Sequence, residues 1–184
     1  MPRRLAPDLH DGVNVSARQF RHQAFLPAVT IALQDSGVDP GTLSLEISEA
    51  TLLQHQESSR SILAAVRALG AHIALGDFGV GRSSLCALGD LPIDSLEINP
   101  ALVRRLATAG GLSPIVDAIV CVGRTMHLDV TAVGIETEAE VEFFRNHGCC
   151  RLQGFHLAAP MSGDEFANWY QSRPAESAHR HART

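Results

Sequence analysis

Residues 43–75 read LSLEISEATLLQHQESSRSILAAVRALGAHIAL, and this stretch decides the fold. An apolar run over residues 43–47 is followed by a helical pattern over residues 57–69 and by a second apolar run over residues 72–75. Strands and helices that alternate along a chain form a parallel sheet covered by helices. Most of the predicted strands are apolar on both faces, which is typical of a sheet with helices on one side and a closed interior on the other.

The same alternation continues in both directions from this stretch. The predicted strands are Gly12 to Ser16, Leu43 to Ile47, His72 to Leu75, Ser95 to Ile98, Asp129 to Ile135 and Cys150 to His156. The predicted helices cover residues 17–36, 57–69, 82–88, 113–127, 137–147 and 163–171. The sequence therefore predicts an α/β fold with six parallel strands.

Capping motifs define several of these helix ends. In a capping box, a hydroxyl and the side chain three residues later satisfy each other's backbone amides. We expect three capping boxes and two glycine C-caps. They are Ser16 with Gln19, Thr137 with Glu140, Ser162 with Glu165, and the glycines Gly70 and Gly148. Along the chain, residues 1–11 are expected to be irregular, residues 12–172 to form one domain, and residues 173–184 to be a disordered tail.

The composition limits the classes of partner. The 184 residues include 15 Lys plus Arg and 20 Asp plus Glu, for a formal net charge of −5. This balance argues against broad electrostatic capture of nucleic acid, and it favours a small-molecule or protein partner. The sequence contains neither an apolar run of transmembrane length nor a leader peptide, and its cysteines follow no zinc or secreted-disulfide spacing. A cytoplasmic protein is expected.

Polar residues follow or interrupt the apolar strands near their carboxyl ends, where a parallel barrel places its reactive groups. They are Asn14, Glu46, Glu49, Asp77, Glu97, Asn99, Glu136 and Gln153. Singly, each such residue is explained by a helix cap or a local hydrogen bond. Together, their carboxylate and amide oxygens would form a hard-cation site that suits magnesium or manganese.

Several motifs then resemble one family, the EAL-domain phosphodiesterases of bacterial cyclic di-GMP signalling. In family order, they are Asn14-Val-Ser16, Leu45-Glu-Ile-Ser-Glu49, Gly76-Asp-Phe-Gly-Val-Gly-Arg-Ser-Ser-Leu85, Leu91-Pro-Ile-Asp-Ser-Leu-Glu-Ile-Asn99, Ala132-Val-Gly-Ile-Glu-Thr137 and Gln153-Gly-Phe155 with Pro160-Met161. The resemblance implies a TIM-type (β/α) barrel of eight strands. It also implies two divalent cations, magnesium or manganese, that activate water for attack on one phosphodiester bond and yield linear pGpG.

The resemblance also implies roles for individual residues. By position, Asn14, Glu46 and Asp77 correspond to metal ligands. Glu49 corresponds to a carboxylate that steadies the following loop, and Glu136 and Gln153 correspond to groups near metal, water or substrate.

The sequence departs from the family pattern at positions that carry the chemistry. Residues 1–12 lack the Glu-Ala-Leu tripeptide, and Gly76 stands where the family has the first of two aspartates. Glu97 replaces a lysine, and Val133 replaces a glutamate implicated as general base. A general base contributes about 100-fold to 10,000-fold to a rate, and a binuclear site without two of its carboxylates should hold metal weakly or not at all.

These departures predict a degenerate EAL-type domain without phosphodiesterase activity that acts, if at all, by binding cyclic di-GMP or a protein. Two alternatives stay open. One is a phosphodiesterase completed by another chain or by rerouted side chains such as Glu97, and the other is a truncated product without function.

The number of predicted strands adds an expectation about assembly. Six strands instead of eight would leave an incomplete barrel with two open edges, at residues 13–16 and 151–155. Open edges recruit partners, so we expect a fragment of a longer protein, a homo-oligomer or a protein complex.

Overall fold

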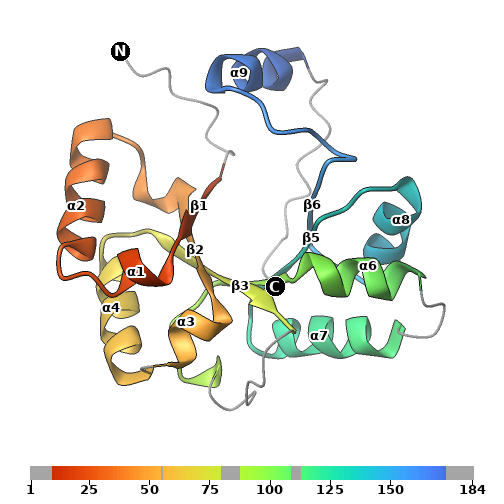
Figure 1. Cartoon of the computed structure of the whole chain (residues 1–184), viewed down its shortest axis with the longest axis horizontal. Coiled ribbons are helices and arrows are strands. Elements are labelled where there is room, and N and C mark those ends of the chain that lie inside the picture. The colour runs from red at the N-terminus through yellow and green to blue at the C-terminus, as the bar shows by residue number, and fades with distance from the viewer. Residues whose placement is uncertain (1–9, 55, 80–87, 109–112, 173–184) are drawn as a thin grey trace.

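The computed structural model describes residues 10–54, 56–79, 88–108 and 113–172. Its centre is one curved sheet of six parallel strands in the order β1-β2-β3-β4-β5-β6 (Figure 1). Neighbours in the sheet are also neighbours along the chain, which is the arrangement of a barrel wall. The predicted α/β class and an incomplete barrel of six strands are therefore confirmed.

The strands are short, and the register between β3 and β4 shifts between Leu75 and Phe78. They are β1 (Asp11–Val15), β2 (Leu43–Ser48), β3 (His72–Phe78), β4 (Ser95–Ile98), β5 (Asp129–Val133) and β6 (Arg151–Gln153). The helices are α1 (Ala17–Phe20), α2 (Phe25–Ser36), α3 (Glu49–Leu53), α4 (Gln56–Ala68), α6 (Pro100–Thr108), α7 (Ser113–Thr125), α8 (Glu138–Asn146) and α9 (Gly163–Ser172), with a 3₁₀ turn at Pro40–Thr42. None of the described helices is long and apolar enough to cross a membrane.

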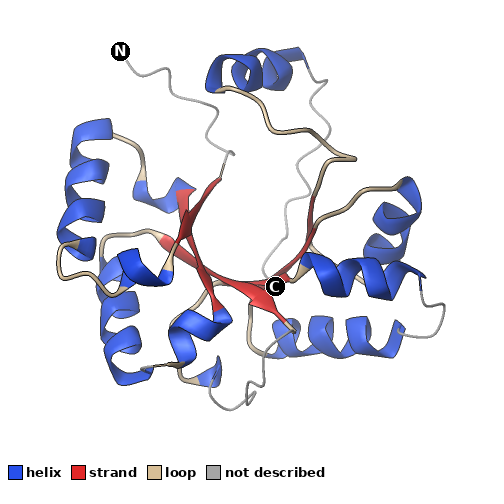
Figure 2. Cartoon of the chain, in the orientation of Figure 1, coloured by secondary structure: helices blue, strands red, loops and turns tan. Residues whose placement is uncertain are grey.

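The hydrophobic core lies between the sheet and the helices on its outer, convex face (Figure 2). Leu75 of β3, Leu63 of α4 and Phe144 of α8 are fully buried in it. Burial of a large apolar side chain contributes about 1.5–3 kcal/mol, so this layer stabilises the wall of the incomplete barrel.

Capping chemistry begins and ends the helices where the sequence predicts it. The capping boxes of Ser16 and Thr137 are both formed. Ser162 and Glu165 bond reciprocally at the start of α9. Gly70 and Gly148 take left-handed backbone angles. The predicted helix over 82–88 falls almost wholly outside the described residues, as do the predictions for residues 1–9 and 173–184.

Other predicted boundaries were wrong. The helix expected over 17–36 is broken between Phe20 and Phe25, since proline inside a continuous helix would lose a hydrogen bond and clash with the preceding turn. The break places Pro27 in the first turn of α2, where proline is tolerated. Helices α3 and α6 were not predicted, and β6 is shorter than the strand predicted over residues 150–156. A Cβ at Gly154 would overlap the backbone of Ile135, so the chain there crosses the end of β5 instead of continuing beside it.

Candidate functional site

A cavity of about 500 Å³ opens at the carboxyl ends of the strands. Strands β1 to β4 and strand β6 contribute polar side chains to its lining, in agreement with the predicted convergence. These side chains are Asn14, Glu46, Asp77, Glu97 and Gln153, and Gly76 and Val133 also line the cavity. We refer to this space as the mouth cavity.

Asp77 is fixed in an uncommon backbone conformation. Its φ of 61° is left-handed, a region that residues other than glycine rarely adopt. The Asn99 Nδ2 amide donates a hydrogen bond of 2.7 Å to Asp77 Oδ1, while Asn99 Oδ1 accepts one of 2.8 Å from the Ala101 amide in α6. Asn99 thus connects the carboxylate to the first turn of α6.

Glu97 lies over the open face of Gly76. A Cβ built on Gly76 would be 3.4 Å from Glu97 Oε2, so the glutamate side chain lies beside the space that a larger residue at position 76 would enter. Burial, and after it the nearby charges of Glu46 and Asp77, together raise the pKa of Glu97 to about 7. The carboxylate is therefore partly protonated near neutral pH.

Glu46 reaches from β2 towards β1. It is paired in the sheet with Asn14, and a Cβ at Gly12 would overlap Glu46 Oε1. The glycine therefore leaves room for the carboxylate at the first strand. Burial raises the pKa of Glu46 as well.

The lining of the mouth cavity is anionic. Its lining has three carboxylates and no Lys, Arg or His. Among the described residues, no three His, Cys, Asp or Glu side chains converge closely enough to hold a metal ion. Asn14, Glu46 and Asp77 share this one cavity.

A second cavity of about 560 Å³ adjoins the mouth cavity, and Val133 and Gln153 line both. It adds the side chains of Arg104, Glu136 and Phe155. Arg104 and Glu136 form an ion pair of 3.7 Å, and the Phe155 ring is 70% exposed. We refer to this space as the outer cavity.

Glu140 fixes the loop that carries Glu136. Its Oε2 accepts hydrogen bonds from the backbone amides of Glu136 and Thr137, at 2.7 and 2.9 Å. The first bond is additional to the predicted capping box. It positions the end of β5 beside the outer cavity.

Not every predicted site residue lines a cavity. Glu49 is buried at the start of α3 and belongs to neither lining. Sequence reasoning missed Arg104 and did not assign Phe155 a role. Phe155 stands in the Gln153-Gly-Phe155 motif, whereas Arg104 lies in α6, a helix that was not predicted.

Comparisons with known proteins agree with this architecture. The EAL domain family profile matches residues 2–160. The bifunctional diguanylate cyclase/cyclic di-GMP phosphodiesterase MucR of Pseudomonas aeruginosa is 40% identical over 158 residues, which are 86% of this chain and 23% of MucR. The chain thus spans about a quarter of the length of this curated relative.

Solved structures give the same result. The PaMucR phosphodiesterase in complex with c-di-GMP superimposes with a TM-score of 0.81 at 39% identity, over 85% of this chain and 64% of that one. Klebsiella pneumoniae BlrP1, solved with manganese and cyclic di-GMP, gives a TM-score of 0.72 at 26% identity, over 79% and 38% of the two chains. The chain belongs to the EAL domain family, and its curved six-stranded sheet is an incomplete EAL barrel.

Proposed function

We propose that this chain binds cyclic di-GMP without hydrolysing it, as a degenerate EAL domain of cyclic di-GMP signalling. The observation that carries the proposal is the pair of adjoining cavities. The mouth cavity has carboxylates but no cationic side chain, and the outer cavity has groups that suit a guanine nucleotide. The proposal draws further support from the relative that was solved with the dinucleotide.

The mouth cavity lacks the general base and one of the metal ligands that the family resemblance implies for hydrolysis. Val133 offers no proton acceptor, and Gly76 offers no ligand. Glu97 places a carboxylate where an incoming phosphate would be repelled. Magnesium and manganese should therefore change the affinity for the dinucleotide little.

The outer cavity offers three contacts for a guanine nucleotide. The exposed ring of Phe155 gives a surface on which a base stacks, which contributes about 1–3 kcal/mol per base. The Glu136 carboxylate can accept hydrogen bonds from the guanine N1 and N2 groups, and the Arg104 guanidinium can pair with phosphate. The Arg104–Glu136 ion pair would have to open, which lowers the net affinity.

Isothermal titration of the full chain with cyclic di-GMP tests the proposal, with EDTA, magnesium or manganese in parallel samples. We expect similar binding heats in all three and no pGpG by chromatography. Phe155→Ala should weaken binding about tenfold or more, as loss of one stacked base predicts. Ile31→Ala, which also removes an exposed apolar side chain but lies on α2, is the matched control. Absence of heat at high micromolar protein, or formation of pGpG, would contradict the proposal.

One observation favours a second candidate, a weakly active phosphodiesterase. The Glu97 carboxylate lies 3.4 Å from the Cβ position of residue 76, so it could stand in for the oxygen ligand that Gly76 lacks. This candidate requires pGpG formation in magnesium or manganese that disappears in Glu97→Gln. Product formation that persists in Glu97→Gln would exclude this role of Glu97.

A further inference from the structure

Among the residues that the structure describes, strand β1 forms one edge of the sheet. Within the described residues it pairs only with β2, so alternate residues direct their backbone N–H and C=O groups away from the sheet. Residues 11–14 are all exposed, and only Val15 is half-buried. An uncovered strand edge of this kind is a template for pairing with another strand.

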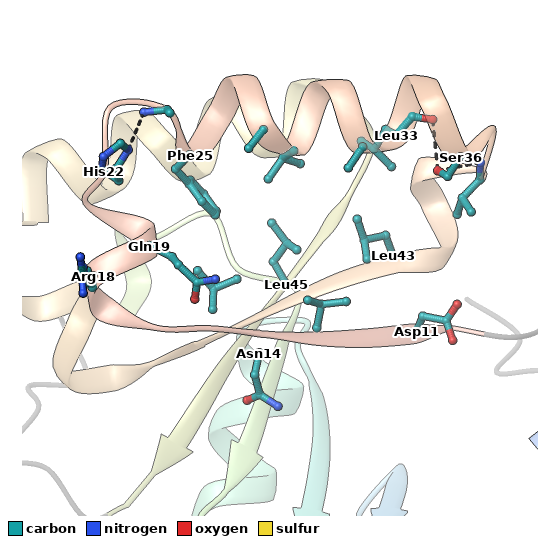
Figure 3. A pocket seen from close by; sticks show the side chains of 17 residues that line it. Asp11, Asn14, Arg18, Gln19, His22, Phe25, Leu33, Ser36, Leu43 and Leu45 are labelled. Carbon is teal, nitrogen blue, oxygen red and sulfur yellow. Dashed lines mark hydrogen bonds between the residues drawn. The ribbon is translucent and has the colours of Figure 1, made fainter. Parts of the chain in front are cut away.

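The surface beside this edge is apolar. A groove of about 660 Å³ separates α2 from the outer face of β1 and β2, and apolar side chains form most of its lining (Figure 3). Val13 lines the groove and is 46% exposed. None of the residues of α2 is buried, although most of them are apolar. The edge therefore combines unpaired backbone groups with uncovered apolar surface.

Two opposite charges lie at the two ends of this edge. Asp11 begins β1, and Arg18 follows its far end in α1; Figure 3 shows the two side chains at opposite ends of the strand. Both line the groove, and neither forms an ion pair within the part of the chain that the structure describes. Val13 lies at the centre of β1, between these charges.

We propose that two copies of this chain associate through antiparallel pairing of their β1 strands, around a two-fold axis at Val13. A two-fold interface requires a patch that is complementary to itself, and the order acid, valine, base meets that requirement. Asp11 of each copy would lie opposite Val15 of the other, beside the turn that leads to Arg18. The two charge pairs would thus form symmetrically, and the two Val13 side chains would meet at the centre.

This inference is independent of the proposed nucleotide binding, because Asp11, Val13 and Arg18 belong to neither the mouth cavity nor the outer cavity. The charge pattern is what selects a second copy as the occupant. A partner of another kind would need its own complementary charges, whereas this chain already carries both.

Sedimentation velocity of the full chain from low to high micromolar concentration tests the interface. We expect a concentration-dependent dimer. Arg18→Glu would place acid against acid twice and should weaken the dimer about tenfold or more, and Asp11→Lys combined with Arg18→Glu should restore it. Arg60→Glu, a charge reversal of an exposed residue on α4, should leave the dimer unchanged.

A second variant keeps the test decisive if the charge reversal impairs folding. Val13→Lys places two like charges at the axis and should give a folded monomer, with its fold checked by circular dichroism. A wild-type chain that stays monomeric at high micromolar concentration would overturn the inference and leave the edge to a different occupant. A dimer that tolerates Val13→Lys or Arg18→Glu would use another surface, and that result would overturn the inference too.

Discussion

Glu97 is partly buried and lies near two other carboxylates, so its ionisation opposes folding. Its pKa is raised from 4.5 to about 7, so the folded chain holds the proton more tightly than the unfolded chain does. The corresponding stability is fully present below pH 4.5 and is lost as the pH rises to 7. Above that pH, the charge on the partly buried carboxylate lowers the stability of the folded chain.

Glu97→Gln should remove this pH dependence. Between pH 4 and pH 8, the free energy of unfolding of the variant should rise by about 2 kcal/mol relative to that of the wild type. One pKa unit corresponds to about 1.4 kcal/mol, and partial exposure of the carboxylate reduces the full value. Urea unfolding at the two pH values measures the difference. Equal pH dependence in both proteins would show that Glu97 ionises normally.

Asn99 is the residue on which the geometry of Asp77 depends. Asn99→Ala should cost about 1–3 kcal/mol, since it removes a hydrogen bond to a charged group and one to the α6 backbone. Asn99→Asp should keep the backbone contact but repel Asp77, so its cost should be larger at pH 8 than at pH 4.

Chemical denaturation compares these variants with Asn146→Ala, an exposed asparagine at the end of α8 that serves as control. An alanine variant at position 99 as stable as the control would show that the left-handed turn at Asp77 forms without the asparagine.

At the scale of elements, helix α8 holds the loop after β5 through one side chain. Glu140 is buried and accepts two backbone amide hydrogen bonds from that loop. The cap therefore couples the start of α8 to the rim of the outer cavity, because the backbone amide of Glu136 donates one of the two hydrogen bonds.

Glu140→Ala should cost about 2 kcal/mol, because it leaves backbone donors unsatisfied at a helix start. Glu140→Gln retains an acceptor oxygen and should cost less. Thermal unfolding provides the measurement, and Glu142→Ala on the exposed side of α8 should change stability by no more than about 0.5 kcal/mol. If both alanine variants behaved alike, the cap would contribute nothing to stability.

At the scale of the whole molecule, the sheet has a centre and two edges. Strands β3 and β4 each pair on both sides, whereas the described partners of β1 and β6 lie on one side only. Figure 1 shows these two edges facing an open side of the curved sheet. Stability should therefore decrease from the middle of the sheet towards its edges.

Amide hydrogen exchange measures this gradient. We expect the slowest exchange in β3 and β4 and the fastest in β1 and β6, because local opening of an edge strand breaks fewer contacts. Protection of β1 should rise with protein concentration if the proposed dimer forms. Uniform protection across all six strands in dilute protein would mean that the sheet opens only as one unit.

Much of the fold follows from local pattern. The alternation of apolar runs and helical segments, the capping boxes and the C-cap glycines all depend on residues close in sequence, so all six strands and most of the helices were predicted. The polar strand ends predicted the mouth cavity for a related reason: parallel strands bring their carboxyl ends to one edge of the sheet. The break before α2 escaped prediction, although Pro27 carried a signal for it.

The sequence by itself determined the fold class, the family and most of the residues that meet at the mouth, since each is encoded in spacing along the chain; Glu49 and Glu136 lie outside the mouth cavity. Only the tertiary structure decided that Glu97 lies over Gly76, that Asn99 fixes Asp77, and that Arg104 and Phe155 border the same cavity as Glu136. These relations join different strands and helices. They depend on side-chain direction and on the curvature of the sheet, and neither is set by residues that are neighbours in sequence.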